Sequence, residues 1–482
     1  MTIDGKDRAR ARRYGGAPRT CNLALLGAWA LLVGCGGAPA APPAVAPTVP
    51  AAAATTVAPA SAAPEPTAAP ASTAPEASAA AVQAAADAAF EYGYPLTETM
   101  RVCDLHPFVN WLHRREKLST PQDTSVVLPN NDTLYATACA YLGAGWVTIT
   151  MPPARGRYQS VQVFDAYTTT AALRGPKQVP VAGAQYVLHL RGSSEAGLPE
   201  GVPVIEVNTP FAFVLFRTLV NGPADLAAAT AAQTGLAVTA SSSGAPERGA
   251  AGSADSPGQD FFLKLMLRLA QNPPPASEAA LIASFATAGI RPQLTPDAAG
   301  ATAQQRAAWE AAYTNGLARL TASMTSLSST RGSWTFLDPN LATPGTNYAL
   351  RALTARVGLF ALPPSESIYP SVTADGTTAH VLQLPRGWPP IDPRGFWSLT
   401  MYNERGFLLE TASNRYSISN RTPGIHLEKD GSLKLYLQCK DPGGAKTANW
   451  LPAPCGKFSA TMRLYLPTAA ALEPSFTLPP LS

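Results

Sequence analysis

Residues 146–151 read Trp-Val-Thr-Ile-Thr-Met, an alternation that places Val147, Ile149 and Met151 on one face of a β-strand. Residues 160–165 alternate in the same way, with two valines on the inward face. Short alternating segments separated by Pro and Gly are typical of an antiparallel β-sandwich. Further segments of this kind are residues 185–190, 204–207 and 211–219. The sequence therefore predicts a β-sandwich in the N-terminal part of the folded chain.

A helix is expected to precede this sandwich over residues 81–100 and to stop near Gly93-Tyr94-Pro95, because Gly and Pro disfavour a helix interior. A short helix over residues 225–234 is expected to close it. Together these elements define a first domain over residues 81–240. Residues 241–258 are rich in Ser, Gly, Ala and Pro, a composition that predicts a flexible linker.

The periodicity changes after the linker. Phe262, Leu265, Met266 and Leu269 lie at i, i+3, i+4 and i+7, as on one face of a helix. We expect a small helical domain over residues 259–365, followed by a C-terminal β-sandwich over residues 366–482. Helical segments are expected at residues 277–288, 303–325 and 348–361. In the C-terminal domain, the alternating segments 433–438 and 462–466 predict half-buried antiparallel strands.

The first 34 residues have the parts of a secretory signal: a basic start, an apolar run over residues 23–33 and small residues at its end. The run is shorter than the roughly 20 apolar residues that a membrane span needs. Its end, Leu32-Val33-Gly34-Cys35, resembles the bacterial lipobox, which predicts a lipidated Cys35 that anchors the protein in a membrane. An ordinary signal peptide and an uncleaved anchor are the alternatives. We expect a cell-envelope location, in the outer membrane facing the periplasm or the surface.

Residues 35–80 are almost wholly Ala, Pro, Thr, Ser and Val, so they have little apolar surface to bury and predict a disordered tether. The formal charge of the 482-residue chain is +4, and residues 1–34 hold six basic and two acidic residues, which accounts for all of it. A neutral mature protein argues against a nucleic-acid partner, because such binding needs a concentrated basic surface.

Of the six cysteines, one lies in the leader and Cys35 would carry lipid, so four remain in an oxidising compartment. Four cysteines allow three connectivities, and we favour the one in which each bridge joins two cysteines of one domain. These pairs are Cys103 with Cys139 and Cys439 with Cys455. Four unpaired thiols are the alternative. A metal site is less favoured, because no CxxC spacing and no neighbouring histidine occur. No cofactor is expected.

Residues 129–135 read Pro-Asn-Asn-Asp-Thr-Leu-Tyr and are the densest polar and aromatic cluster of the chain. One interpretation is turn chemistry before a strand, since Asn and Asp side chains bond to nearby backbone amides; Asp165 would then pair with Arg157 at a strand edge. The other is a ligand-binding site. Its candidate residues are Asn130, Asp132, Tyr135, Arg157, Tyr158, Asp165 and Arg217, with Trp397, Tyr402 and Trp450 in the C-terminal domain.

Several motifs, in order, resemble the paired domain-of-unknown-function families 1254 and 1214. The first resemblance rests on residues 92–96, 129–135, 157–158, 164–167 and 217–218, and the second on residues 368–370, 396–402, 430–433, 449–454 and 463–465. The resemblance implies an immunoglobulin-like sandwich, a small helical domain and a jelly-roll-like sandwich. It supplies no mechanism, since both families are named for lacking one. The linker insertion, the cysteines and the lipobox with its tether depart from the usual family pattern.

Three functions fit these observations. The first is an envelope binding module for a carbohydrate-like or other small polar ligand, because aromatic rings stack on sugars while amides and carboxylates take hydroxyl groups. The second is a hydrolase in which Asp132 or Asp165 is a general base and Arg157 or Arg217 holds an anionic group. The third is a structural or assembly role.

Overall fold

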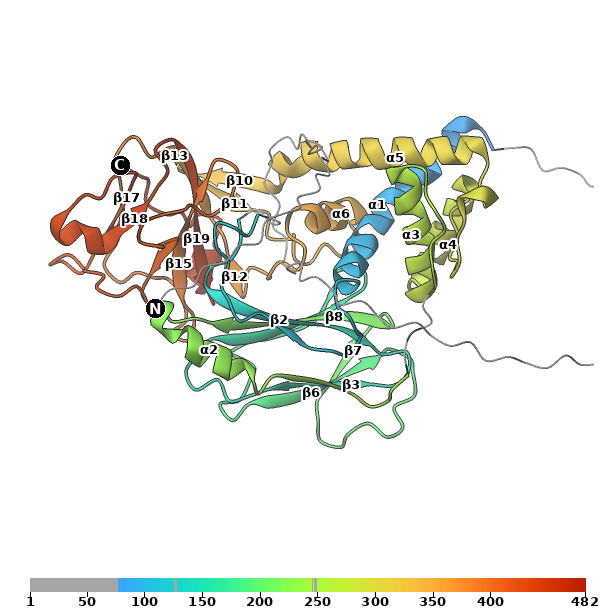
Figure 1. Cartoon of the computed structure of the whole chain (residues 1–482), viewed down its shortest axis with the longest axis horizontal. Helices are drawn as coiled ribbons and strands as arrows, with labels where there is room; N and C mark the ends of the chain where they lie inside the picture. The colour runs from blue at the N-terminus through green and yellow to red at the C-terminus, as the bar shows by residue number, and fades with distance from the viewer. Residues whose placement is uncertain (1–76, 125–127, 245, 247–248) are drawn as a thin grey trace, which may run out of the picture.

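The computed structural model describes residues 77–124, 128–244, 246 and 249–482. The predicted leader, the lipobox and nearly all of the predicted tether lie outside these residues. Figure 1 shows three units in contact, a β-sandwich, a helical layer and a second β-sandwich. The fold is mainly β with a helical unit, as the sequence predicts. No helix within the described ranges is long and apolar enough to cross a membrane.

The N-terminal sandwich has two sheets. One has the strand order β1-β2-β8-β4-β5 and the other the order β7-β6-β3-β9. Alanine, valine and isoleucine side chains of both sheets, such as Ala138, Ile149 and Val163, form the core between them. The strands are β1 (His113–Arg114), β2 (Thr133–Tyr141), β3 (Val147–Met151), β4 (Gln159–Asp165), β5 (Thr170–Arg174), β6 (Ala184–Leu190), β7 (Val204–Val207), β8 (Phe211–Leu219) and β9 (Ala237–Ala240).

The helical layer covers the other face of the five-stranded sheet (Figure 1). Phe164 and Phe213 of this sheet pack against Phe360, which follows α6, so β4 and β8 are buried along their whole length. The helices are α1 (Ala79–Cys103), α2 (Leu226–Gln233), α3 (Pro257–Gln271), α4 (Ala279–Ser284), α5 (Ala303–Ala322), α6 (Tyr348–Val357) and α7 (Ala469–Leu472). Short 3-10 turns are η1 (Pro223–Asp225), η2 (Ala276–Glu278), η3 (Phe285–Ala288), η4 (Ala298–Gly300), η5 (Ser323–Leu327) and η6 (Gly444–Asn449).

Helix α1 differs from the sequence prediction, because it continues through Pro95 to Cys103 instead of stopping. A proline inside a helix costs about 3 kcal/mol. Burial of the surrounding residues, including Tyr92, Tyr94 and Leu96, offsets this cost. Gly93 is needed for the close packing, since a Cβ at this position would lie 2.4 Å from the Leu265 side chain.

The C-terminal sandwich has one sheet of order β10-β11-β13-β19-β15-β16, in which β12 also pairs with β19, and a second sheet of order β14-β17-β18. Leucine, methionine and tryptophan side chains fill its core. The strands are β10 (Ser328–Arg331), β11 (Trp334–Leu337), β12 (Ser367–Ile368), β13 (Ser371–Asp375), β14 (His380–Leu384), β15 (Trp397–Asn403), β16 (Ser417–Ser419), β17 (Leu433–Gln438), β18 (Trp450–Pro452) and β19 (Lys457–Tyr465).

Two boundaries differ from the prediction. Residues 328–337, expected within the helical domain, form β10 and β11 and hydrogen-bond into the C-terminal sheet. In the predicted linker, Ser241 bonds to Trp146 and Gly252 bonds to Pro296, so these parts are held against both neighbouring units. At these two points the segment is in contact with the N-terminal sandwich and with the helical unit.

The cysteines of each predicted pair lie at disulfide distance. The Cα atoms of Cys103 and Cys139 are 5.2 Å apart, and those of Cys439 and Cys455 are 5.0 Å apart. The first pair joins α1 to β2. The second joins the residue that follows β17 to the loop that follows β18. Both pairings are those favoured from the sequence.

Candidate functional site

The segment before β2 is a turn held by Asn130. Its side-chain Oδ1 accepts hydrogen bonds from the backbone N–H groups of Asp132 at 2.7 Å and Thr133 at 3.0 Å. This is the bonding that Asn favours in turns. The turn chemistry expected from the sequence is present, and it fixes the direction in which the neighbouring side chains point.

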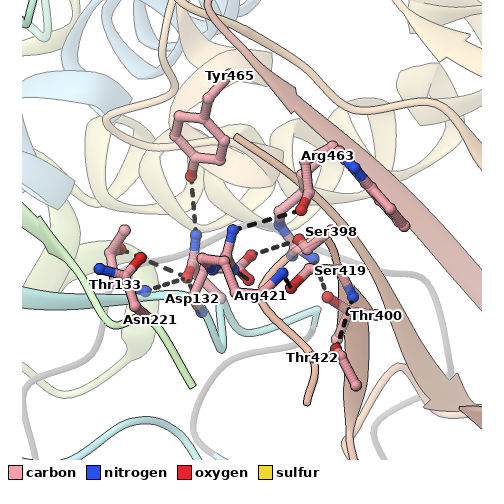
Figure 2. Close-up of polar contacts among 12 residues, drawn as sticks. Asp132, Thr133, Asn221, Ser398, Thr400, Ser419, Arg421, Thr422, Arg463 and Tyr465 are labelled. Carbon is pink, nitrogen blue, oxygen red and sulfur yellow. Dashed lines mark hydrogen bonds and ion pairs between the residues drawn. The ribbon is translucent and has the colours of Figure 1, made fainter. Parts of the chain in front are cut away.

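Those side chains point into the C-terminal sandwich (Figure 2). The Asp132 carboxylate is 1% exposed; it accepts a hydrogen bond from Ser398 Oγ at 2.5 Å and forms an ion pair with Arg421 at 2.7 Å. The Asn130 amide donates to the Tyr465 hydroxyl at 2.9 Å. Both carboxylate oxygens of Asp132 are therefore engaged by residues more than 260 positions later in the chain.

Arg421 lies against an aromatic ring as well as against this carboxylate. Its guanidinium carbon is 4.6 Å from the centre of the Phe396 ring, and that ring stacks on Tyr465 at 4.0 Å. Burial lowers the pKa of Arg421, while the charge of Asp132 opposes this shift. A buried charge is stable only where it is paired, so Asp132 and Arg421 hold each other in place.

A second arginine, Arg463 of β19, also connects the two sandwiches. It donates to Thr400 Oγ1 at 2.7 Å, to the Tyr402 hydroxyl at 2.7 Å and to the Leu128 carbonyl at 3.2 Å. The Tyr402 hydroxyl donates in turn to the Pro129 carbonyl at 2.8 Å. Tyr402, a predicted ligand-binding residue, is fully buried and fixes the two sandwiches together.

These contacts correct the prediction that the strand over residues 462–466 is half-buried. The other predicted segment, residues 433–438, forms β17 and alternates between buried and half-buried residues as expected. The apolar side chains of β19, such as Met462 and Leu464, do face the core, as the alternation predicts. The alternate residues Arg463 and Tyr465 are also buried, because the N-terminal turn covers that face. The polar face of the strand is therefore an interdomain surface rather than a solvated one.

Tyr158 makes a third connection, through the hydrogen bond from its hydroxyl to the Glu366 carboxylate. Both side chains are buried. Burial raises the pKa of Tyr158 well above its usual value, and burial also raises the pKa of Glu366. The proton therefore stays on the phenol and the contact is a fixed hydrogen bond.

Next to these contacts is a cavity of about 90 Å³, enclosed by the two sandwiches and the chain after α6. Tyr135 of β2 and Arg217 of β8 are cross-strand neighbours in the five-stranded sheet, and both side chains line the cavity. The lining residues are Leu128, Pro129, Asn130, Tyr135, Arg217, Leu337, Leu341, Val357, Gly358, Leu359, Phe360, Ala361, Leu362, Tyr369, Arg463 and Tyr465. Within the described chain this lining includes arginines and phenols but no acidic residue.

Arg217 is 5% exposed. It donates to Gln162 Oε1 and to the Phe360 carbonyl, each at 3.0 Å. Among the described residues it has no carboxylate at ion-pair distance; Glu366 contributes an opposite charge from further away, and its carboxylate is bonded to Tyr158. A cation this deeply buried ordinarily requires a charged partner. The cavity therefore offers a positive charge that no described carboxylate contacts directly.

The backbone around the cavity is strained at two residues. Leu128 has φ of 51° and Phe360 has φ of 66°, in the left-handed region that residues with a Cβ seldom adopt. Both residues line the cavity, and both carbonyls accept hydrogen bonds from its arginines. Strain of this kind is often retained at ligand-binding sites.

A larger pocket, of about 630 Å³, lies on the other side of the turn, between residues 117–120, the start of α2 and residues 413–423. Two charged residues that line this pocket, Asp132 and Arg421, are paired with each other. Arg415 on its wall donates to three backbone carbonyls. The other cations on its lining, Lys117 and Arg415, are exposed and half-buried, so water can solvate their charges, whereas Arg217 is buried.

Other predicted site residues lie elsewhere. Arg157 pairs with Asp225, which lowers the pKa of that carboxyl, so the expected pairing of Arg157 with Asp165 is wrong. Asp165 accepts from the backbone N–H groups of Tyr167 and Thr169 in the β4–β5 turn. Burial raises its pKa to about 6.

The aromatic residues proposed to stack on a sugar are not available for it. Trp397 is 2% exposed and belongs to the core of the C-terminal sandwich. Trp450 is half-buried and donates from Nε1 to the Gln438 carbonyl of the neighbouring strand. In the described parts of the chain, no group of three or more His, Cys, Asp and Glu residues converges to hold a metal ion.

Sequence reasoning missed Arg421, Arg463, Tyr369 and Tyr465 as site residues. Tyr369, Arg463 and Tyr465 fall inside motifs that carry the family resemblance, and this was the available signal. Arg421 lies just after β16, and no sequence motif around it distinguishes it from a surface arginine.

Comparison with known proteins agrees with the sequence resemblance. Residues 109–240 match the family described as Protein of unknown function (DUF1254), and residues 371–469 match the family described as Protein of unknown function (DUF1214). The order of the two matches confirms the prediction. None of the curated proteins matches the sequence.

Two solved structures are similar. The VPA0106 protein from Vibrio parahaemolyticus is 20% identical, with a TM-score of 0.64, over 83% of this chain and 99% of that one. A putative uncharacterized protein from Burkholderia cenocepacia is 13% identical, with a TM-score of 0.40, over 80% of this chain and 91% of that one. The first likeness supports the fold.

Proposed function

We propose that this protein binds a small ligand with an anionic group in the cavity between its two sandwiches and its helical layer. The observation that carries the proposal is Arg217, a buried cation with no ion-pair partner among the described residues. Arginine presents a planar fork of donors that matches a carboxylate or phosphate. An anion in the cavity would supply the missing charge.

The neighbouring phenols support the same chemistry. The Tyr135 hydroxyl lines the cavity beside Arg217 and makes no hydrogen bond to any described residue. Tyr465 accepts from Asn130, which leaves its own O–H available as a donor. Two hydroxyl donors and a guanidinium around one small space favour an anion over a neutral sugar.

A hydrolase is less favoured than a binding protein. Asp132, the expected general base, has both carboxylate oxygens engaged by Ser398 and Arg421. A general base must reach the proton that it removes, and this carboxylate is 1% exposed. Asp165 is held by two backbone amides at a turn.

We place this binding protein in the bacterial envelope, anchored through lipid on Cys35, on the strength of the lipobox resemblance and the apolar leader. The two cysteine pairs at disulfide distance agree with an oxidising compartment. The 45-residue Pro-rich and Ala-rich segment after Cys35, residues 36–80, would separate the folded units from the membrane.

The test is calorimetric titration of the chain, with Cys35 replaced by serine so that no detergent is needed. Acetate, inorganic phosphate and methanesulfonate are the anionic probes, and glucose and N-acetylglucosamine are the neutral ones. We expect at least one anion to bind, and Tyr135→Phe to weaken it about tenfold or more, since a hydrogen bond to a charged group contributes about 1.5–3 kcal/mol.

Arg217→Gln should abolish anion binding. The matched control is Arg191→Gln, because Arg191 lies in the same sandwich and its side chain is 62% exposed. Circular dichroism melting checks that each variant folds, and Tyr135→Phe keeps the ring in place if Arg217→Gln does not fold. Binding of the neutral sugars alone, or equal anion binding by wild type and Tyr135→Phe, would overturn the proposal.

A further inference from the structure

The loop between α1 and β1, residues 104–112, carries a group of exposed apolar side chains. Leu105, Phe108 and Trp111 are 44%, 64% and 42% exposed. Seven large apolar side chains are exposed in the described chain, and these three fall within the seven positions 105–111. Phe108 and Trp111 are the two aromatic residues of that set. Exposed apolar residues that stand singly are ordinary on a protein surface, whereas a group of them marks an interaction surface.

The residues between these side chains fix the loop to strand β2. His106 is buried, and its Nε2 lies 2.9 Å from Thr137 Oγ1. The backbone N–H of Asn110 donates to the Cys139 carbonyl at 2.8 Å, and Asn110 Oδ1 accepts from the backbone N–H of Tyr141 at 2.8 Å. The apolar side chains are therefore presented to the outside by a loop that is itself held in place.

The surroundings of the loop favour a flat apolar surface as its partner. None of the three side chains lines the candidate cavity or four other cavities of the described chain. A small ligand needs a concave site, so these side chains do not fit one. The charges beside them are paired, Arg101 with Glu98 at 2.9 Å and Asp104 with Arg268 at 2.5 Å. Projecting Trp, Phe and Leu side chains are typical of proteins that lie on a membrane surface.

The predicted anchor brings a membrane within reach of this loop. The described chain begins at residue 77, just before α1, and the predicted tether lies between this point and Cys35. Helix α1 has 25 residues and is about 37 Å long. A tether of residues 36–80 could span on the order of 100 Å if extended, so it is long enough for the far end of α1 to reach the membrane. Anchoring also raises the effective concentration of the loop at the surface, so a weak contact suffices.

We propose that the loop of residues 104–112 contacts the surface of the bilayer in which Cys35 is anchored. Leu105, Phe108 and Trp111 would lie among the lipid head groups, where their burial removes apolar surface from water. The contact would give the folded units one orientation on the membrane. This inference rests on the envelope location proposed above, and it is independent of the anion cavity.

The experiment follows the tryptophan fluorescence of the full-length chain with vesicles of phosphatidylethanolamine and phosphatidylglycerol, with and without brominated lipid. Subtracting the spectrum of Trp111→Phe from that of the wild type leaves the emission of Trp111. We expect this emission to shift to shorter wavelength when vesicles are added and to be quenched by brominated lipid. The matched control is Trp146→Phe, which isolates a half-buried tryptophan of the same sandwich; its difference spectrum should not respond.

Phe108→Ser tests the contact while Trp111 stays in place as the reporter. It should remove most of the shift and of the quenching. The matched control is Leu427→Ser, because the Leu427 side chain is also 64% exposed and lies in the other sandwich. Both replaced side chains are exposed, so both variants should fold, and circular dichroism melting checks this.

The outcomes separate the loop contact from the anchor. If the chain floats with the vesicles but Trp111 is not quenched, the anchor stands and the loop contact is refuted. Equal quenching in wild type and Phe108→Ser also refutes the contact. If Trp111 shifts without vesicles as the protein concentration rises, a second copy of the chain covers the loop and a lipid surface is the wrong occupant. If the chain does not float, the loop contact and the envelope location both fail.

Discussion

Replacing Arg421 with methionine should destabilise the junction between the sandwiches more than any loss of a surface ion pair. The Asp132 and Arg421 side chains are 1% and 11% exposed, and their charged atoms are 2.7 Å apart. The variant leaves Asp132 buried with only the Ser398 bond to its carboxylate. Removing one partner of a buried pair costs about 3–5 kcal/mol, and the lost contact with Phe396 adds to this.

The assay is urea unfolding followed by circular dichroism, with Lys264→Ala as the control. Lys264 pairs with Asp260 on α3, and both side chains are about half exposed. Such a pair contributes about 0.3–0.5 kcal/mol. Because the Asp132–Arg421 pair joins two units, Arg421→Met should also lower the slope of the transition, as the units unfold separately.

A double-mutant cycle with Asp132→Asn gives the sharpest test. The two residues share one contact, so the double variant should lose less than the sum of the single losses, by about 2 kcal/mol or more. A loss for Arg421→Met within about 1 kcal/mol of the Lys264→Ala value, or additive losses in the cycle, would show that the pair does not hold the junction.

Three further outcomes are expected. Burial raises the pKa of Asp165 to about 6, so the folded state favours the protonated carboxyl. This stabilisation is present below about pH 4 and is lost as the pH rises to about 6. In urea titrations, Asp165→Asn should therefore be more stable than wild type by up to about 3 kcal/mol near pH 7, with no gain at low pH. Joint replacement of Cys103 and Cys139 by alanine opens a loop of 36 residues and should cost about 4 kcal/mol in the same assay; an unchanged midpoint would argue against a formed bond. Radiolabelled palmitate should enter the wild-type chain but not Cys35→Ser, and labelling of both would refute the lipobox assignment.

The strands were predictable because alternation records which side chains face a core. The segments 146–151 and 160–165 form β3 and β4 almost at the expected bounds. Helix α1 was predicted too short, because local rules weigh Gly93 and Pro95 without the tertiary packing that holds them in a helix.

The partners of the polar residues were not predictable in the same way. The turn at Asn130 was expected, since its bonds reach only two or three residues along the chain. Asp132 bonds to Arg421, 289 positions away, and no periodicity encodes such a distance. Arg463 and Tyr465 alternate with apolar residues as a solvated face would, so only the packing of the N-terminal turn against β19 reveals that they are buried.

The bridge between Cys103 and Cys139 also determines how a mechanical load would cross the molecule. A pull at the N-terminal end of α1 would run along the helix to Cys103 and pass through the covalent bond to Cys139 in β2. Strand β2 is paired on both sides and leads back to Asp132, which is tied to Arg421. Residues 104–124 and 128–131 would thus be spared the direct load, and tension would reach the second sandwich through a short and largely buried path.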